Sequence, residues 1–311
     1  MKKTILTGFQ PTGAIHIGNY LAVMAGIRQQ QEQYDCYFFI ADWHSLTVDY
    51  KVEEKRAMIK DLIAILLASG LDPEKCVFFR QSDILEHAEL AWYFNCVTPI
   101  SFLERMTQYK DKAAKNVKNI NAGLMLYPVL MAADILMYDS DLIPVGVDQV
   151  QHIELARDTA KFFNNRFGET FKAPEPLLTD MPKIMSLTEP TKKMSKSDNP
   201  KSAILVADEP EVIMEKIKKA TADEVGISNL LGLGKKFIKN FDAADYKDNN
   251  LKLKTELAQG LADYFAEIRE KRKEWLTKDA EIEKILAKGA EKARSIAQKK
   301  MDDVRRKVGL K

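Results

Sequence analysis

The sequence lacks the long apolar runs that would cross a membrane. No run in its 311 residues approaches the roughly 18 apolar residues that a spanning helix needs. The first residues, MKKTILTGFQPTG, also lack the apolar region and the small-residue cleavage site of a signal peptide. The composition, 46% hydrophobic and 30% charged, is typical of a globular protein. We therefore expect a cytoplasmic protein.

Cysteine and net charge are both scarce. The three cysteines, Cys36, Cys76 and Cys96, are widely spaced among apolar neighbours, which favours buried reduced thiols over disulfides. No two of the four histidines and three cysteines have the spacing of zinc ligands, so no protein-built metal site is predicted. Because the formal net charge is only +2, any contact with nucleic acid must rest on a local basic patch.

The first half of the chain alternates short apolar runs with helical patterns. Strands are predicted at 4–8, 36–41, 76–80 and 142–145. Helices are predicted at 18–34, 53–69, 124–138 and 149–166. This order predicts an α/β fold with a doubly wound, parallel, Rossmann-like sheet, in which ligands bind beyond the carboxyl ends of the strands.

After about residue 186 strand-like runs almost vanish. One helical stripe carries apolar residues at spacings of three and four, namely Ile282, Leu286, Ala290, Ala293, Ala297, Met301, Val304 and Val308. We expect a Rossmann-like catalytic domain at 1–186 with a helical insertion around 95–140. An all-helical region is expected at 187–311, with its last helix packed back on the first domain.

Two segments have the composition of phosphate-binding loops. GAIHIGNY, at 13–20, follows the first strand and begins a helix, whose free backbone N–H groups and positive dipole end attract anions. Taken alone, an ordinary capped turn explains it more often. PTKKMSKSDNP, at 190–200, interleaves lysines with hydroxyls, although a solvated face is an equally good explanation. Together they indicate a site that holds a phosphate chain at both ends.

HIGN followed far downstream by KMSKS resembles the paired signature of the class I aminoacyl-tRNA synthetases, with Asn19 in place of the usual final histidine. The segments GFQPTGAIHIGNY, ADWHSLTVDY, YPVLMAADILMYDSDLIPVGVDQVQHIELARD and IMSLTEPTKKMSKSD are similar, in this order, to bacterial tryptophanyl-tRNA synthetases. Two departures are visible. Val147 stands where an acid is expected, and the stretch after 218–223 is shorter than in many relatives.

The resemblance implies a tryptophan–tRNA ligase. Such an enzyme joins L-tryptophan to the α-phosphorus of ATP, releases pyrophosphate and transfers the tryptophanyl group to tRNA(Trp). In-line phosphoryl chemistry needs positioning and charge neutralisation. The resemblance assigns His16 and Asn19, with the amide of Gly18, to the α-phosphate, and Lys193 and Lys196 to the departing pyrophosphate.

The resemblance also implies the residues that contact ATP. They are Gln10, Pro11, Thr12, Gly18, Asn19, Lys112, Gly146, Val147, Asp148, Ile184, Lys193, Met194, Ser195, Lys196 and Ser197. For Lys112, a solvated basic helix that attracts tRNA phosphate is an equally good explanation. Mg²⁺ is expected to bind mainly through the phosphates, since it keeps water and substrate ligands.

Tryptophan is expected to be selected by Asp134, whose carboxylate would accept the indole N–H in an apolar pocket. The other residues assigned to tryptophan are Gln10, His44, Tyr127, Met131 and Gln149. A helix-surface acid or a salt-bridge partner is the alternative for Asp134, and a core histidine satisfied by a neighbour is the alternative for His44. His87 and His152 receive no role, and His87 is predicted at the surface.

Two other functions remain open from the sequence. A compact tyrosyl-tRNA synthetase shares the fold and both motif classes, and a nucleotide-binding protein without aminoacylation would also keep the fold. The segments KARSIAQKK and DDVRRKVGLK carry basic residues that could meet an anticodon stem. The family also implies a homodimer, with the apolar stretch 93–106 facing the partner, although packing within the subunit explains that stretch nearly as well.

Overall fold

The centre of the protein is a sheet of five parallel strands. The computed structural model describes residues 2–107, 121–178, 184–195 and 199–311. The strands lie in the order β3-β2-β1-β4-β5. Their bounds are β1 Thr4–Phe9, β2 Asp35–Ile40, β3 Cys76–Arg80, β4 Leu142–Val145 and β5 Glu175–Leu178. The four predicted strands and the doubly wound α/β class are confirmed, and β5 was not predicted.

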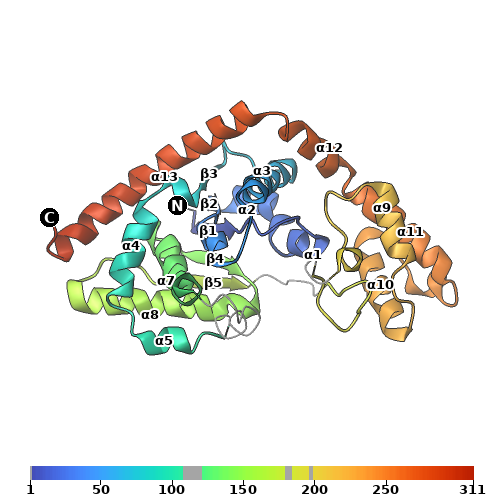
Figure 1. Cartoon of the computed structure of the whole chain (residues 1–311), viewed down its shortest axis with the longest axis horizontal. Coiled ribbons are helices and arrows are strands. Elements are labelled where there is room, and N and C mark those ends of the chain that lie inside the picture. The colour runs from blue at the N-terminus through green and yellow to red at the C-terminus, as the bar shows by residue number, and fades with distance from the viewer. Residues whose placement is uncertain (1, 108–120, 179–183, 196–198) are drawn as a thin grey trace.

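Helices connect the strands and cover both faces of the sheet (Figure 1). Their bounds are α1 Ile17–Asn19, α2 Ile27–Gln33, α3 Val52–Ala68, α4 Glu86–Asn95, α5 Ile100–Glu104, α7 Ala122–Met137 and α8 Val150–Phe167. The predicted helices at 53–69, 124–138 and 149–166 are confirmed within one or two residues. The single helix predicted at 18–34 is wrong, because a π-helical turn at Tyr20–Met24 separates α1 from α2.

Successive side chains along each strand point to opposite faces of the sheet, and each face has its own apolar core. Phe38 and Phe78 point to one side, where they pack with α1, α2 and α3, whereas Phe39 and Phe79 point to the other, where they pack with α4, α7 and α8. All four side chains are nearly or fully buried. The sheet is thus buried on both faces, as its continuous apolar strands predict.

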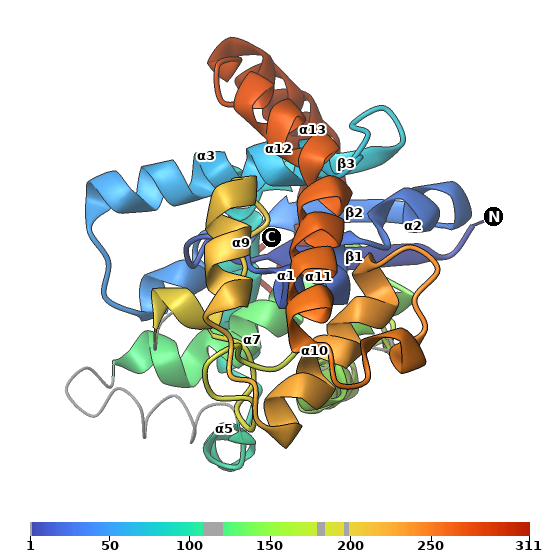
Figure 2. The ribbon, with the colours of Figure 1, turned by 90° about the vertical axis from the view of Figure 1, so that its right-hand side faces the viewer.

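The C-terminal part of the described chain is helical. Its helices are α9 Pro210–Lys218, α10 Glu224–Phe237, α11 Asn250–Tyr264, α12 Ala266–Trp275 and α13 Asp279–Lys307. Figures 1 and 2 show α9, α10 and α11 beside one another at one end of the molecule, with α12 leading back toward α3. Their apolar side chains are continuous with the core on the α3 face of the sheet.

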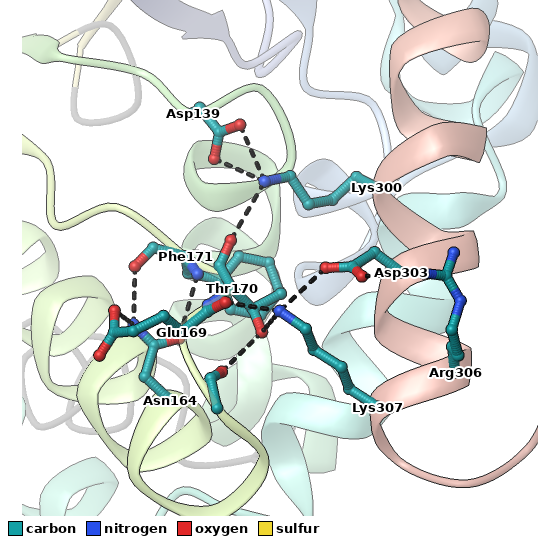
Figure 3. A network of polar contacts seen from close by, with 10 residues as sticks. Asp139, Asn164, Glu169, Thr170, Phe171, Lys300, Asp303, Arg306 and Lys307 are labelled. Carbon is teal, nitrogen blue, oxygen red and sulfur yellow. Dashed lines mark hydrogen bonds and ion pairs between the residues drawn. The ribbon is translucent and has the colours of Figure 1, made fainter.

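The long helix α13 returns across the outer edge of the sheet, along β3 and α4. Seven of the eight residues of the predicted stripe are buried, and Val308 is half-buried. Gly289 permits the close approach to β3, because a Cβ there would lie 1.8 Å from the carbonyl oxygen of Phe78. Polar contacts hold the last turns of α13 against the rest of the chain. Figure 3 shows the contacts of Lys300 with Asp139 and of Lys307 with Thr170.

The cysteine prediction is partly wrong. Cys36 and Cys76 are buried and reduced, as expected. Cys96 is exposed, because it caps the C-terminal end of α4, beyond the buried face of that helix. Within the described part of the chain, no helix is both long and apolar enough to span a bilayer.

Candidate active site

The candidate site lies where the strand order changes direction. β1 leads to β2 on one side and β4 lies on the other, so the crevice beyond their carboxyl ends is the usual ligand position in such sheets. The loops that follow these strands carry Gln10, His44 and Gly146. The first two loops are joined directly, since Nε2 of Gln10 donates a hydrogen bond of 3.0 Å to the carbonyl oxygen of His44.

The HIGN turn, residues 16–19, forms the first wall. Gly13 has a φ of 103°, which glycine adopts readily and which turns the chain toward α1. His16 caps α1: its Nδ1 accepts the backbone N–H of Gly18 at 3.1 Å and of Asn19 at 3.3 Å. An acceptor nitrogen carries no proton, so the neutral imidazole holds its proton on Nε2. The resemblance to the family assigned the amide of Gly18 to the α-phosphate, but in this structure that amide donates to His16.

Backbone hydrogen bonds hold the HIGN turn and the lysine-rich segment, residues 190–200, to chain that flanks this segment. Ile17 N–H donates to the carbonyl of Ile204 at 2.9 Å, just beyond this segment. Met194 N–H donates to the carbonyl of Ile184 at 2.9 Å. A Cβ built on Gly18 would lie 3.5 Å from Cβ of Ile184, so the residue expected to touch adenine lies against the HIGN turn.

The side chains of the lysine-rich segment are partly described. Met194 is buried, Ser195 is half-buried and Lys193 is exposed. Its backbone is held at Ser195, whose carbonyl accepts the hydroxyl of Ser202 at 2.7 Å. Lys196 and Ser197, with Lys112 of the ATP set, lie outside the described residues.

A buried polar cluster surrounds Asp134 on α7. Asp134 as a residue is 1% exposed, and its Oδ2 lies 2.8 Å from Nε2 of His44. Its Oδ1 accepts Nε2–H of Gln81 at 2.7 Å and lies 2.6 Å from Nδ1 of His87. Burial alone would raise the pKa of Asp134, but the hydrogen bonds from His44 and His87 outweigh it and hold that pKa below its ordinary value. The surface alternative for Asp134 is therefore wrong.

The surface position predicted for His87 is also wrong. This histidine is completely buried and joins Asp134 to Tyr138, whose hydroxyl lies 2.7 Å from its Nε2. A signal was present in the sequence: His87, Leu90, Ala91 and Phe94 follow one helical face, and all four are buried on α4. Gln81, the other buried partner of Asp134, comes directly after β3.

Further residues assigned to tryptophan lie around this cluster. The ring of Tyr127 is edge-on to His44, with 6.2 Å between centroids, and its hydroxyl lies 3.1 Å from Nε2 of His152. Burial raises the pKa of Tyr127 to about 12, so its hydroxyl stays protonated. Met131 is half-buried on α7, whereas Gln149 bonds Asp148 at 3.0 Å and has no hydrogen bond to the Asp134 cluster among the described contacts.

An apolar groove of about 340 Å³ opens beside Tyr127, between α4 and α7. Its walls include Trp43, Leu46 and Trp92. Val147, which follows β4, is 78% exposed, and nothing in the described structure explains why it replaces an acid. Among the described residues, no group of three His, Cys, Asp or Glu side chains is placed to hold a metal ion.

Comparison with known proteins identifies relatives over the full length. The family model of class I tRNA synthetases for tryptophan and tyrosine matches residues 2–295. The tryptophan–tRNA ligase of Rickettsia felis is 44% identical, and the match covers 100% of this chain and 99% of that protein.

Two solved structures are also similar. The tryptophanyl-tRNA synthetase of Mycoplasma pneumoniae has a TM-score of 0.88 and 34% identity, over 100% of this chain and 99% of that one. The enzyme of Campylobacter jejuni, complexed with ADP and tryptophan, has a TM-score of 0.87 and 36% identity, over 99% of this chain and 100% of that one.

Proposed function

Because the chain belongs to the class I tRNA synthetases for tryptophan and tyrosine, as a tryptophan–tRNA ligase of bacterial type, we propose how its residues perform the reaction. It activates L-tryptophan with ATP, releases pyrophosphate and transfers the tryptophanyl group to tRNA(Trp). The observation that supports the choice of tryptophan is the buried carboxylate of Asp134, which lies beside His44 and the ring of Tyr127. Its Oδ2 accepts the indole N–H.

The pocket rejects amino acids that lack this donor. A phenylalanine ring there would exclude water from Oδ2 without supplying the indole donor, and an unmade buried hydrogen bond costs about 1–3 kcal/mol, and more for a charged group. Tyr127 and Met131 pack on the indole ring. Gln10 also contacts the bound amino acid, and Gln149 holds the α-amino group together with Tyr127.

The HIGN turn supports the triphosphate. We assign Nε2–H of His16 as the donor to the α-phosphate, because its Nδ1 is occupied by the amides of Gly18 and Asn19. The Asn19 side chain is the second donor. A fixed donor pointed at developing charge needs no reorganisation during the reaction.

The remaining ATP contacts are proposed from the likeness to the family. Lys193 and Lys196 neutralise the departing pyrophosphate, and Mg²⁺ would bind mainly through the phosphates and supply further positive charge there. The other proposed contacts are Gln10, Pro11, Thr12, Lys112, Gly146, Val147, Asp148, Ile184, Met194, Ser195 and Ser197.

ATP–pyrophosphate exchange tests the function directly. We expect exchange that depends on tryptophan and is negligible with equimolar tyrosine. Exchange driven only by tyrosine would favour the tyrosyl alternative. No exchange with either amino acid would favour a nucleotide-binding protein without catalysis.

We propose that residues 1–186 form the catalytic domain, with the helical insertion around 95–140, and that 187–311 form the tRNA-binding region. Basic side chains of α13 would meet the anticodon stem in the cytoplasm, where tRNA is charged. Filter binding at several salt concentrations tests this contact: a steep loss of affinity with salt is expected, and a flat, weak response would contradict it.

We also propose a homodimer formed through α4, α5 and the stretch 93–106. Ile100 is 63% exposed and Trp92 is 67% exposed, and the apolar groove lies beside Trp92. Ile100→Glu should place a charge in this interface and shift the mass in light scattering toward the monomer. A wild-type protein that is monomeric at micromolar concentration would contradict the proposal.

A further inference from the structure

The hydrogen bonds around Asp134 divide its two carboxylate oxygens into different roles. An ionised carboxylate only accepts hydrogen bonds, so Nε2 of His44 and Nδ1 of His87 must both carry protons. Oδ1 accepts two donors, from Gln81 and His87, at 2.7 and 2.6 Å. Oδ2 accepts one donor among the described residues, from His44, so it retains capacity for a second.

The orientation of His87 is itself fixed. Its Nδ1 bonds Asp134, and its Nε2 lies 2.7 Å from the hydroxyl of Tyr138, so both ring nitrogens have a hydrogen-bond partner. Burial raises the pKa of Tyr138 well above its ordinary value, so this hydroxyl remains protonated. Phe39 and Phe79, which stack on each other at 5.7 Å, pack beside this ring with centroids 6.2 and 6.1 Å from the imidazole. A ring bonded at both nitrogens and packed in this way cannot turn without losing a buried hydrogen bond.

Helix α13 makes polar contacts with both of the segments that carry His87 and Tyr138. Arg305 binds Glu89 on α4 at 2.7 Å, two residues after His87. Lys300 binds both oxygens of Asp139, the residue that follows Tyr138, at 2.6 and 2.8 Å (Figure 3). These contacts with α13 therefore help to fix the distance between His87 and Tyr138 from outside the pocket.

We propose that His87, oriented by Tyr138, is a positioning residue that occupies Oδ1 of Asp134 and thereby presents Oδ2 to the indole N–H of tryptophan. It sets the KM for tryptophan and the rejection of rings without this donor, and it takes no part in phosphoryl transfer. This inference rests on the proposed role of Asp134. A core histidine that only stabilises the fold is the competing explanation.

Three variants separate positioning from stability. His87→Leu removes both hydrogen bonds, His87→Asn keeps an N–H near the position of Nδ1, and Tyr138→Phe removes only the hydroxyl. Thr159→Val is the matched control, because it deletes a buried hydroxyl on α8 whose partner is Thr98, at 3.3 Å. All are measured by ATP–pyrophosphate exchange, with unfolding in urea recorded in parallel.

A tryptophan analogue whose indole nitrogen is replaced by sulfur provides the decisive readout. It keeps the ring shape and lacks the N–H, so it gains nothing from a positioned Oδ2. We expect His87→Leu to raise the KM for tryptophan about tenfold, the effect of weakening one hydrogen bond to a charged group. The kcat and the KM for ATP should stay within about twofold of wild type, and the KM for the analogue should hardly change. His87→Asn should recover most of the loss, and Tyr138→Phe should show a smaller loss of the same kind.

The outcomes distinguish a failure of the proposed function from a failure of the positioning role of His87. If wild type does not activate tryptophan, the proposed function fails. If it does, but the variants lose kcat equally with tryptophan and the analogue, or behave as Thr159→Val does, the positioning role is overturned. Should His87→Leu fail to fold, Tyr138→Phe and His87→Asn decide by the same comparison, because each removes fewer atoms.

Discussion

Substitution of Gly18 by alanine tests how the HIGN turn is built. A Cβ at this position would lie 2.9 Å from both Cε1 and Nδ1 of the His16 ring, closer than carbon atoms approach without a shift. The backbone of α1 accommodates alanine, since Gly18 does not have a positive φ. The imidazole, which is buried, must therefore move, and its Nδ1 loses the alignment with the two amides that it accepts.

The magnitude follows from those two hydrogen bonds. Each hydrogen bond contributes about 0.5–1.5 kcal/mol. Losing both therefore removes about 1–3 kcal/mol of the free energy that holds Nε2 in place. If Nε2–H stabilises the α-phosphate in the transition state, kcat/KM for ATP in pyrophosphate exchange falls by about 5- to 150-fold. The KM for tryptophan should change little, because the Asp134 cluster is on α7 and not on the HIGN turn.

Gly232→Ala is the matched control. It lies within α10, and a Cβ there meets nothing within 4 Å. This variant should keep wild-type exchange and gain up to about 1 kcal/mol of stability from helix propensity. Equal activity of Gly18→Ala and Gly232→Ala, with both folded, would refute the role given to His16.

Three further results are expected. Lys193→Ala should slow adenylate formation at least about tenfold in single-turnover experiments while leaving tryptophan binding intact; an unchanged rate would remove this lysine from the pyrophosphate site. Gly289→Ala should lower the free energy of unfolding by about 1–3 kcal/mol or more in urea titrations, because its Cβ meets the carbonyl of Phe78 on β3, and a wild-type midpoint would contradict the close approach. The folded pKa of Asp134 lies below its unfolded value of about 3.9, so its stabilisation is complete above that pH and lost as pH falls through the folded pKa. Asp134→Asn should therefore lose less stability than wild type between about pH 5 and pH 3, and parallel losses would contradict the charge network.

The parts of the fold that the sequence predicts are those with a strong local pattern. Four strands are apolar runs bounded by turns, and the apolar stripe of α13 repeats over eight positions. Both features can therefore be predicted from the local sequence. β5 is a strand of four residues containing Pro176, with no clear periodicity, and it forms only because β4 offers an edge. The break after α1 was hidden, because an apolar stripe continues across the π-helical turn.

In the candidate site, too, only the residues with a strong local pattern could be predicted from the sequence. The HIGN turn and Asp134 stand out by local composition and by resemblance. His87 acts through partners 47 and 51 residues away, so its role depends on how α4 meets α7 and is invisible to short motifs. Its place on the apolar face of α4 was the available signal, since a histidine in such a row must find a buried partner.

A crystal structure with tryptophan and a non-hydrolysable ATP analogue is the most direct measurement. We expect the indole nitrogen within about 3 Å of Oδ2 of Asp134, with His87 still on Oδ1 and the α-phosphate near Nε2 of His16. An indole ring bound outside this cluster, or a triphosphate that leaves the HIGN turn untouched, would contradict the assignment of both substrates.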